Sequence, residues 1–173
     1  MVLQTSDLPP GFPVDRAATG TVTNADLVRE HGRTYGIKIH RWGRLTGYKA
    51  FFRQRDPAKG ALPGVFGFGA GVVLFRTASG AHASLVDRSS GCTRKFTVIP
   101  LAGHQPVGPD TLVCTIGKEL GKVHARVFLV QWRNGRAAGG VYVVAAEGAV
   151  TPLTALIGAR KQNRRMAAQL RGG

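Results

Sequence analysis

The strongest constraint on the fold comes from the stretch Val123 to Gly148, in which two β-rich runs flank the dipeptide Asn134-Gly135. Asn-Gly readily supplies the two positive φ angles of a type I′ turn, so this stretch is predicted to form a long β-hairpin. A two-residue turn at Asn134-Gly135 places Trp132 opposite Ala137 and fixes the register of both strands.

Both faces of this hairpin are largely apolar. One face carries Val127, Leu129, Tyr142 and Val144, and the other carries Phe128, Val130, Trp132, Val141 and Val143. A hairpin at the edge of a sheet in water would not tolerate two apolar faces. We therefore expect the hairpin to lie in the middle of a sheet that is covered on both sides.

The rest of the chain supplies elements for such a sheet and its covers. Strands are predicted at residues 36–42, 48–54, 72–75, 96–101 and 111–116, with a glycine-rich loop over 56–71. Helices are predicted at 25–31, at 80–89 and from Pro152 onward, where proline occupies the first helical position. These elements predict a single α+β domain over 1–173, with residues 1–22 as an extended N-terminal segment. Its central sheet is mostly antiparallel and carries helices on both faces, which is an α/β/α sandwich.

The charge balance is strongly positive, with 24 lysines and arginines against 9 acidic residues and a net charge of +15. A positive field of this size favours an anionic polymer or surface as partner, or a protein with an acidic face. Genome composition and solubility can produce the same arginine-rich balance, so the charge alone does not identify the partner.

Two features bear on the compartment. No apolar run approaches the ~18 residues of a membrane span, and no signal peptide is visible, so the chain is either cytosolic or a mature form with an added Met1. Cys92 and Cys114 can form one disulfide that closes a loop of ~20 residues, which would indicate an oxidising compartment. Two buried free thiols are the alternative.

The sequence predicts no catalytic residue, no metal site and no cofactor. Its acidic residues are scattered, and its five histidines include no HxH or HExxH spacing. The glycine-rich stretch 64–71 is followed by a predicted strand, whereas a phosphate-binding glycine loop needs a helix N-terminus behind it.

Two groups of residues are candidates for contact with an anionic partner. The first surrounds the hairpin turn and the second lies on the closing helix: Trp132, Arg133 and Arg136, then Arg160, Lys161, Arg164 and Arg165. An arginine pair beside an indole can stack on a sugar and bind a carboxylate or phosphate. Exposed turns and amphipathic helices also carry arginine simply because these positions are solvated.

Five segments resemble, in the same order, secreted bacterial domains of the PsbP/Mog1-like superfamily, which include actinobacterial surface lipoproteins and sensor-like ectodomains. The segments are SDLPPGF, GRLTGYKAFF, GVVLFRTASGAHASL, FLVQWRNGRAAGGVYV and ALIGARKQNRRMAAQL. The resemblance implies an α/β/α sandwich outside the cytoplasm without assigned catalysis. The sequence shows no lipobox cysteine, so the lipid anchoring of the family is not carried over to this chain.

These observations predict a non-catalytic extracytoplasmic binding domain with a cationic surface that contacts an anionic envelope component or a protein partner. One alternative is a structural subunit of a homo-oligomeric or filamentous surface assembly, in which the apolar hairpin or the N-terminal segment packs against another copy. A small enzyme is a further alternative, for which the residues supply no catalytic constellation. The oligomeric state is left open by the sequence.

Overall fold

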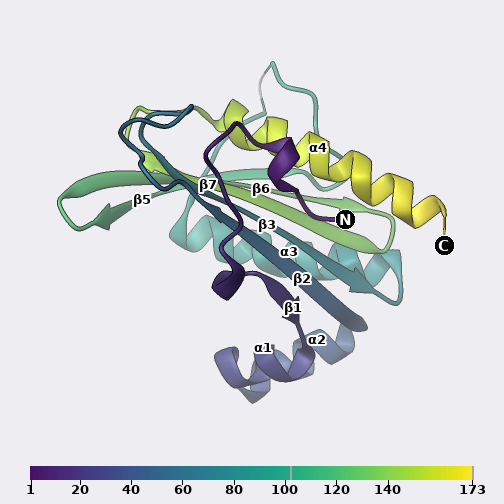
Figure 1. The fold of residues 1–173 in the computed structure, drawn as a ribbon. Helices are drawn as coiled ribbons and strands as arrows, with labels where there is room; N and C mark the ends of the chain where they lie inside the picture. The colour runs from purple at the N-terminus through teal and green to yellow at the C-terminus, as the bar shows by residue number, and fades with distance from the viewer. Residues whose placement is uncertain (102, 173) are drawn as a thin grey trace.

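The computed structural model describes residues 1–101 and 103–172, with the backbone alone for residues 91–95, and it shows one antiparallel sheet with helices (Figure 1). The strands are β1 (Gly20–Val22), β2 (Arg44–Arg53), β3 (Val65–Phe75), β4 (Thr97–Val98), β5 (Leu112–Leu120), β6 (Val123–Asn134) and β7 (Ala137–Ala146). The helices are α1 (Asn24–His31), α2 (Arg33–Arg41), α3 (Ala78–Lys95) and α4 (Pro152–Arg171). The α+β class predicted from the sequence is confirmed.

The hairpin of β6 and β7 lies at the centre of the sheet. In the described part of the chain, seven strands are ordered β1-β2-β3-β7-β6-β5-β4, so β7 has three strands on either side. Each neighbouring pair is antiparallel. The prediction that this hairpin occupies the middle of the sheet is therefore confirmed.

The register of the hairpin differs from the predicted one by two residues. Asn134 pairs with Ala137 and Trp132 pairs with Gly139, so the two-residue turn consists of Gly135 and Arg136. The predicted pairing of Trp132 with Ala137 is wrong. Because side chains alternate with a period of two, a shift of two residues leaves each side chain on its predicted face.

Helices cover the two faces of the sheet unequally (Figure 1). Helix α4 packs on β6 and β7, and this side is called the α4 face. Helix α3 contacts β3, β6 and β7 from the other side, the α3 face, while α1 and α2 contact β2. Part of each face near the outer strands is thus left without a helix.

The larger core lies under α4. Trp132 and Met166 are each 0% exposed and contribute to a cluster that extends along the α4 face. The N-terminal segment joins this cluster through Leu3 and Phe12, each 1% exposed. Within residues 1–22 the chain forms two turns of 3-10 helix and strand β1, so only part of the segment predicted to be extended is extended.

Residues 36–42 were predicted to be a strand, and this prediction is wrong because most of them form helix α2. Ile37 and Ile39 alternate with polar residues as in a half-buried strand, but Ile37 is 66% exposed. The buried side is formed by Tyr35, Ile39 and Trp42, which follow helical i, i+4, i+7 spacing and pack in the core of the α3 face.

Strand β3 begins at Val65 and therefore includes most of the glycine-rich stretch that was predicted to be a loop. Gly69 leaves room for the ring of Tyr142 from β7, because a Cβ atom at position 69 would lie 2.0 Å from Tyr142 Cζ. The glycines thus serve packing between strands. The strand predicted at 96–101 is much shorter, since β4 consists of Thr97–Val98 alone.

Candidate functional site

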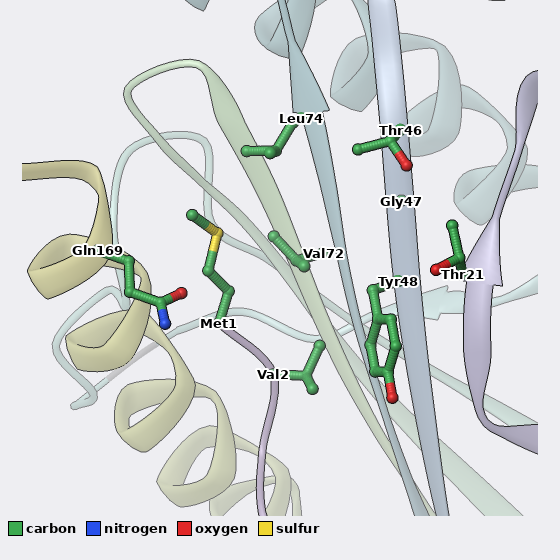
Figure 2. A pocket seen from close by; sticks show the side chains of 9 residues that line it. All are labelled: Met1, Val2, Thr21, Thr46, Gly47, Tyr48, Val72, Leu74 and Gln169. Atoms are coloured by element: carbon green, nitrogen blue, oxygen red, sulfur yellow. The ribbon is translucent and has the colours of Figure 1, made fainter. Parts of the chain in front are cut away.

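An apolar pocket opens on the α4 face beside the outer strands, and Figure 2 shows the residues around it. Its volume is about 430 Å³, which is within the range of small-molecule sites. Its walls come from the N-terminus, three strands and the end of α4: Met1, Val2, Thr21, Thr46, Gly47, Tyr48, Val72, Leu74 and Gln169. We call it the outer-strand pocket.

Strand pairing explains why these side chains meet. Tyr48 pairs with Val72 on one side and with Thr21 on the other, and paired residues direct their side chains to the same face. Thr46 and Leu74 form the next pair on that face. Helix α4 packs further along the sheet, on β6 and β7, so it does not cover these residues.

The N-terminal segment and the end of α4 close the remaining side. In Figure 2 the side chains of Met1 and Gln169 lie on the α4 side of the pocket, and Thr21 and Tyr48 lie on the opposite side. Val72 is 6% exposed and belongs to the floor, whereas Tyr48 is 41% exposed at the rim. The pocket therefore combines an apolar floor with hydroxyl and amide groups around its opening.

The lining residues define the chemistry that the pocket offers. The floor can bury an apolar group, and the hydroxyl groups of Thr21, Thr46 and Tyr48 with the amide of Gln169 can orient it by hydrogen bonds. The lining contains no carboxylate, histidine, cysteine or lysine side chain. These walls are suited to binding a largely apolar group.

A second hollow of about 370 Å³ lies on the α3 face, on the other side of the same strands. The rings of Phe51 and Tyr142 stack at its edge with centroids 6.1 Å apart, and Gly71 and Gly140 line it without side chains. Lys49 borders it and is exposed. This part of the α3 face presents aromatic surface to solvent.

The structure places Trp132, predicted as a contact residue, in the core. Its ring is 0% exposed, and its Nε1 donates to Asn163 Oδ1 at 3.0 Å. The indole belongs to the face of the hairpin that α4 covers, so no ligand can stack on it. The prediction that Trp132 contacts a partner is therefore wrong, because α4 buries this face of the sheet.

The two arginines near the hairpin turn also have different surroundings. Arg133 Nε donates to Asp110 Oδ2 at 2.7 Å. Arg133 pairs across the hairpin with Ala138, so it does not face Arg136. Arg136 lies in the turn and is exposed. Of the residues predicted around this turn, Arg136 keeps a cationic group available to a partner.

The four cations of α4 are partly engaged by neighbouring backbone and by Asp7. Arg165 forms two hydrogen bonds to the Asp7 carboxylate, at 2.9 and 3.0 Å, and Lys161 Nζ donates to the Asp7 backbone oxygen. Arg160 donates to the Gln105 backbone oxygen at 2.9 Å. Arg164 is exposed and has no ion pair with any described residue. Among these four cations, only Arg164 forms neither a hydrogen bond nor an ion pair with a side chain or backbone group of the described residues.

Burial and hydrogen bonding shift the pKa of the Asp7 carboxyl in opposite directions. Burial by itself would raise its pKa, but the hydrogen bonds from Arg165 and from the Gln4 backbone N–H lower the pKa below its ordinary value. Asp7 therefore stays ionised and ties the N-terminal segment to α4, next to the outer-strand pocket.

The predicted disulfide involves Cys92, whose side chain lies outside the described residues. Cys114 is 0% exposed on β5. The Cys92–Cys114 bond remains a prediction.

Acidic residues neutralise few of the cations. Within the described residues, eight of the nine carboxylates take part in ion pairs, and the Lys and Arg side chains that they engage are Arg29, Lys38, Arg53, Arg126, Arg133 and Arg165. The chain carries 24 such side chains. Most of the described Lys and Arg side chains thus form no ion pair with a carboxylate.

The described residues form neither a cluster of metal ligands nor a membrane-spanning helix. They contain no group of three or more His, Cys, Asp or Glu side chains positioned to hold a metal ion. None of their helices combines the length and the apolar character that crossing a membrane requires.

The outer-strand pocket was not predicted from the sequence. The alternation of Thr46 with Tyr48 and of Val72 with Leu74 indicates that these residues share a face, which is a local signal. The approach of Met1 and Gln169 depends on how the chain ends pack, and no local pattern encodes it.

Comparison with known proteins identifies no family. No protein-family model matches the sequence. No curated protein sequence matches it either. Among solved structures, the chain is similar to the crystal structure of the extracellular domain of PknH from Mycobacterium tuberculosis, with 12% identity over 99% of this chain and 93% of that chain and a TM-score of 0.45. A likeness of this size establishes neither a shared family nor a shared function, so the predicted PsbP/Mog1-like relationship is not confirmed.

Proposed function

We propose that the chain is a non-catalytic binding domain whose outer-strand pocket receives an apolar group of its ligand or partner. The observation that carries this proposal is the composition of the pocket, an apolar floor rimmed by neutral hydroxyl and amide groups. Its volume of about 430 Å³ suits a small molecule or a protruding apolar side chain.

Binding of an apolar fluorescent probe tests this proposal. N-phenyl-1-naphthylamine gains fluorescence when it enters an apolar site, and we expect saturable binding to the wild-type chain. Thr46→Trp adds a large ring at the rim, so this variant is expected to lose most of the binding. Thr97→Trp, at an exposed threonine of β4 outside the pocket, is the matched control and is expected to bind as the wild type does. Equal binding by the two variants contradicts the proposal.

The cationic surface supports the second part of the proposed function, contact with an anionic envelope component or an acidic protein partner. Such binding releases the counter-cations of the partner's phosphates or carboxylates. Its affinity therefore falls steeply as the salt concentration rises. Retention on immobilised heparin is therefore expected to decrease as sodium chloride rises. Retention that is independent of salt contradicts the electrostatic part of the proposal and leaves the pocket assay unaffected.

A location outside the cytoplasm is the third part, and the predicted Cys92–Cys114 disulfide supports it. Protein isolated without reductant and alkylated is expected to show no modified cysteine by intact mass, and two modified cysteines after reduction. Two alkylated cysteines before reduction contradict the disulfide and remove its support for this location.

The α3 face favours a second candidate function, a subunit of a homo-oligomeric surface assembly. Tyr142 is 36% exposed and stacks with Phe51 on a part of the sheet that no helix covers. The edge strands β1 and β4 have three and two residues, which disfavours assembly by strand pairing at the edges. Light scattering over a concentration series distinguishes the candidates: a monomer throughout rules out this assembly, and an oligomer abolished by Tyr142→Glu supports it.

A further inference from the structure

A buried arginine lies under α1 at the start of β2, with no carboxylate beside it. Arg44 is 5% exposed, and its guanidinium donates to the Val22 backbone oxygen at 2.7 Å and to the side-chain oxygen of Asn24. Its Nε is buried and has no hydrogen-bond partner. Gly47 makes room for the side chain, because a Cβ atom there would lie 2.5 Å from Arg44 Nη2. All its acceptors are neutral, so the positive charge is uncompensated.

A buried charge without a counter-ion is unfavourable, and the charges nearby increase the cost. Burial lowers the pKa of Arg44, and Arg88 on α3 lowers it further, while the opposing influences come from Tyr35 and Asp26. The Asp26 carboxylate is already occupied by Thr23 and by an ion pair with Arg29. Asp26 therefore acts on Arg44 only from a distance, and no carboxylate is hydrogen-bonded to the Arg44 guanidinium.

Arg44 lines a hollow of about 620 Å³ between α1, α2 and the sheet, where Arg29, His40 and Arg76 also contribute. His40, Gly43 and Arg76 also line an adjoining hollow of about 910 Å³. The only carboxylate in the lining of either hollow is Asp87, which forms an ion pair with Lys38 at 2.7 Å.

The backbone holds Arg76 at the boundary between the two hollows. Its N–H donates to the Gly43 oxygen at 2.9 Å, and Gly43 has a φ of 65°, a conformation that glycine adopts without strain. The Arg76 side chain is exposed and has no ion pair with any described residue. The exposed Arg136 lies in the neighbouring turn. Its backbone oxygen accepts a hydrogen bond from the Phe75 N–H at 3.0 Å.

We propose that this hollow is an anion-binding site that takes a phosphoryl group between Arg44 and Arg76. The planar guanidinium groups match the oxygens of a phosphoryl group, and a doubly charged anion supplies the counter-charge that Arg44 lacks. The site deepens the anionic part of the proposed function, and it lies apart from the outer-strand pocket. If phosphate does not bind at this site, the results expected from the pocket assay and from heparin retention do not change.

Titration calorimetry with inorganic phosphate at constant ionic strength tests the site. The wild type is expected to bind phosphate saturably, and Arg76→Gln is expected to bind it about tenfold more weakly, the effect of losing one charge-assisted hydrogen bond. Arg164→Gln is the matched control, because Arg164 is also an exposed arginine without an ion pair but belongs to α4. It is expected to bind as the wild type does. No saturable binding, or equal weakening in both variants, overturns the proposal.

Vesicles distinguish a lipid headgroup from free phosphate as the source of the phosphoryl group. If a headgroup is bound, vesicles that contain phosphatidic acid, a phosphomonoester, are expected to retain the wild type but not Arg76→Gln, and inorganic phosphate is expected to compete. If vesicles do not bind while inorganic phosphate does, the site takes a soluble phosphorylated ligand. Vesicle binding that neither Arg76→Gln nor phosphate reduces comes from the diffuse surface charge and counts against this site.

Discussion

Two adjacent glycines of β7 are expected to respond in opposite ways to the same substitution. A Cβ atom on Gly139 would lie 2.5 Å from Cζ2 of Trp132 and 3.0 Å from Sδ of Met166, and both of these side chains are 0% exposed. A Cβ atom on Gly140 would meet nothing closer than 3.9 Å. Neither glycine has a positive φ, so space alone separates the two positions.

The magnitudes follow from these distances. Overpacking a filled core costs about 1–3 kcal/mol, and Gly139→Ala belongs at the upper end because neither neighbour can move into solvent. Gly140→Ala is expected to stabilise the chain by about 0.5–1 kcal/mol, since alanine loses less backbone entropy in a strand. For a chain of this size, a loss of about 3 kcal/mol lowers the melting temperature by roughly 6–12 °C.

Urea unfolding of the two variants, followed by circular dichroism, measures the difference directly. Each variant is the other's control, because the residue exchanged and the strand are the same. Unfolding free energies that agree within about 0.5 kcal/mol would refute the tight contact of Trp132 with β7.

Two further predictions concern polar contacts that fasten α4. Asn163→Ala removes the acceptor of the buried Trp132 Nε1 and is expected to destabilise the chain by about 2–3 kcal/mol in urea unfolding, whereas a loss below about 0.5 kcal/mol contradicts that role. Asp7→Asn is expected to cost about 1 kcal/mol at pH 7, discounted for the partial exposure of Arg165. Because the folded-state pKa of Asp7 is lowered, this stabilisation is present above its unfolded-state pKa and is lost as the pH falls through the folded-state value. The two chains should therefore converge in stability as the pH falls below the folded-state pKa of Asp7, and a constant difference across the acidic range counts against the ion pair.

The sequence predicted those elements whose local pattern agrees with their packing. The hairpin, α1 and α4 carry strong turn, cap and proline signals, and they form in the predicted segments, although the hairpin turn lies one residue later than predicted. Residues 36–42 satisfy two periodicities at once, alternation at Ile37 and Ile39 and helical spacing at Tyr35, Ile39 and Trp42. The contact with α3 and the sheet selects the helical pattern, and that contact is invisible in the local sequence. Gly69 of β3 has the same character, since the ring of Tyr142 fills its space from another strand.

The proportions of the sheet explain why the candidate pocket lies at the outer strands rather than at the hairpin turn. Seven strands spaced by about 4.8 Å extend over about 29 Å, whereas one helix is only about 10 Å across. The apolar hairpin requires cover on both faces, so α3 and α4 pack over the central strands, and Trp132 is buried as a consequence. On the α4 face the outer part remains uncovered, and there the N-terminal segment borders the outer-strand pocket. On the α3 face the Phe51–Tyr142 pair of β2 and β7 faces solvent. In a chain with this many strands and so few long helices, the positions open to ligands are those that the helices cannot reach.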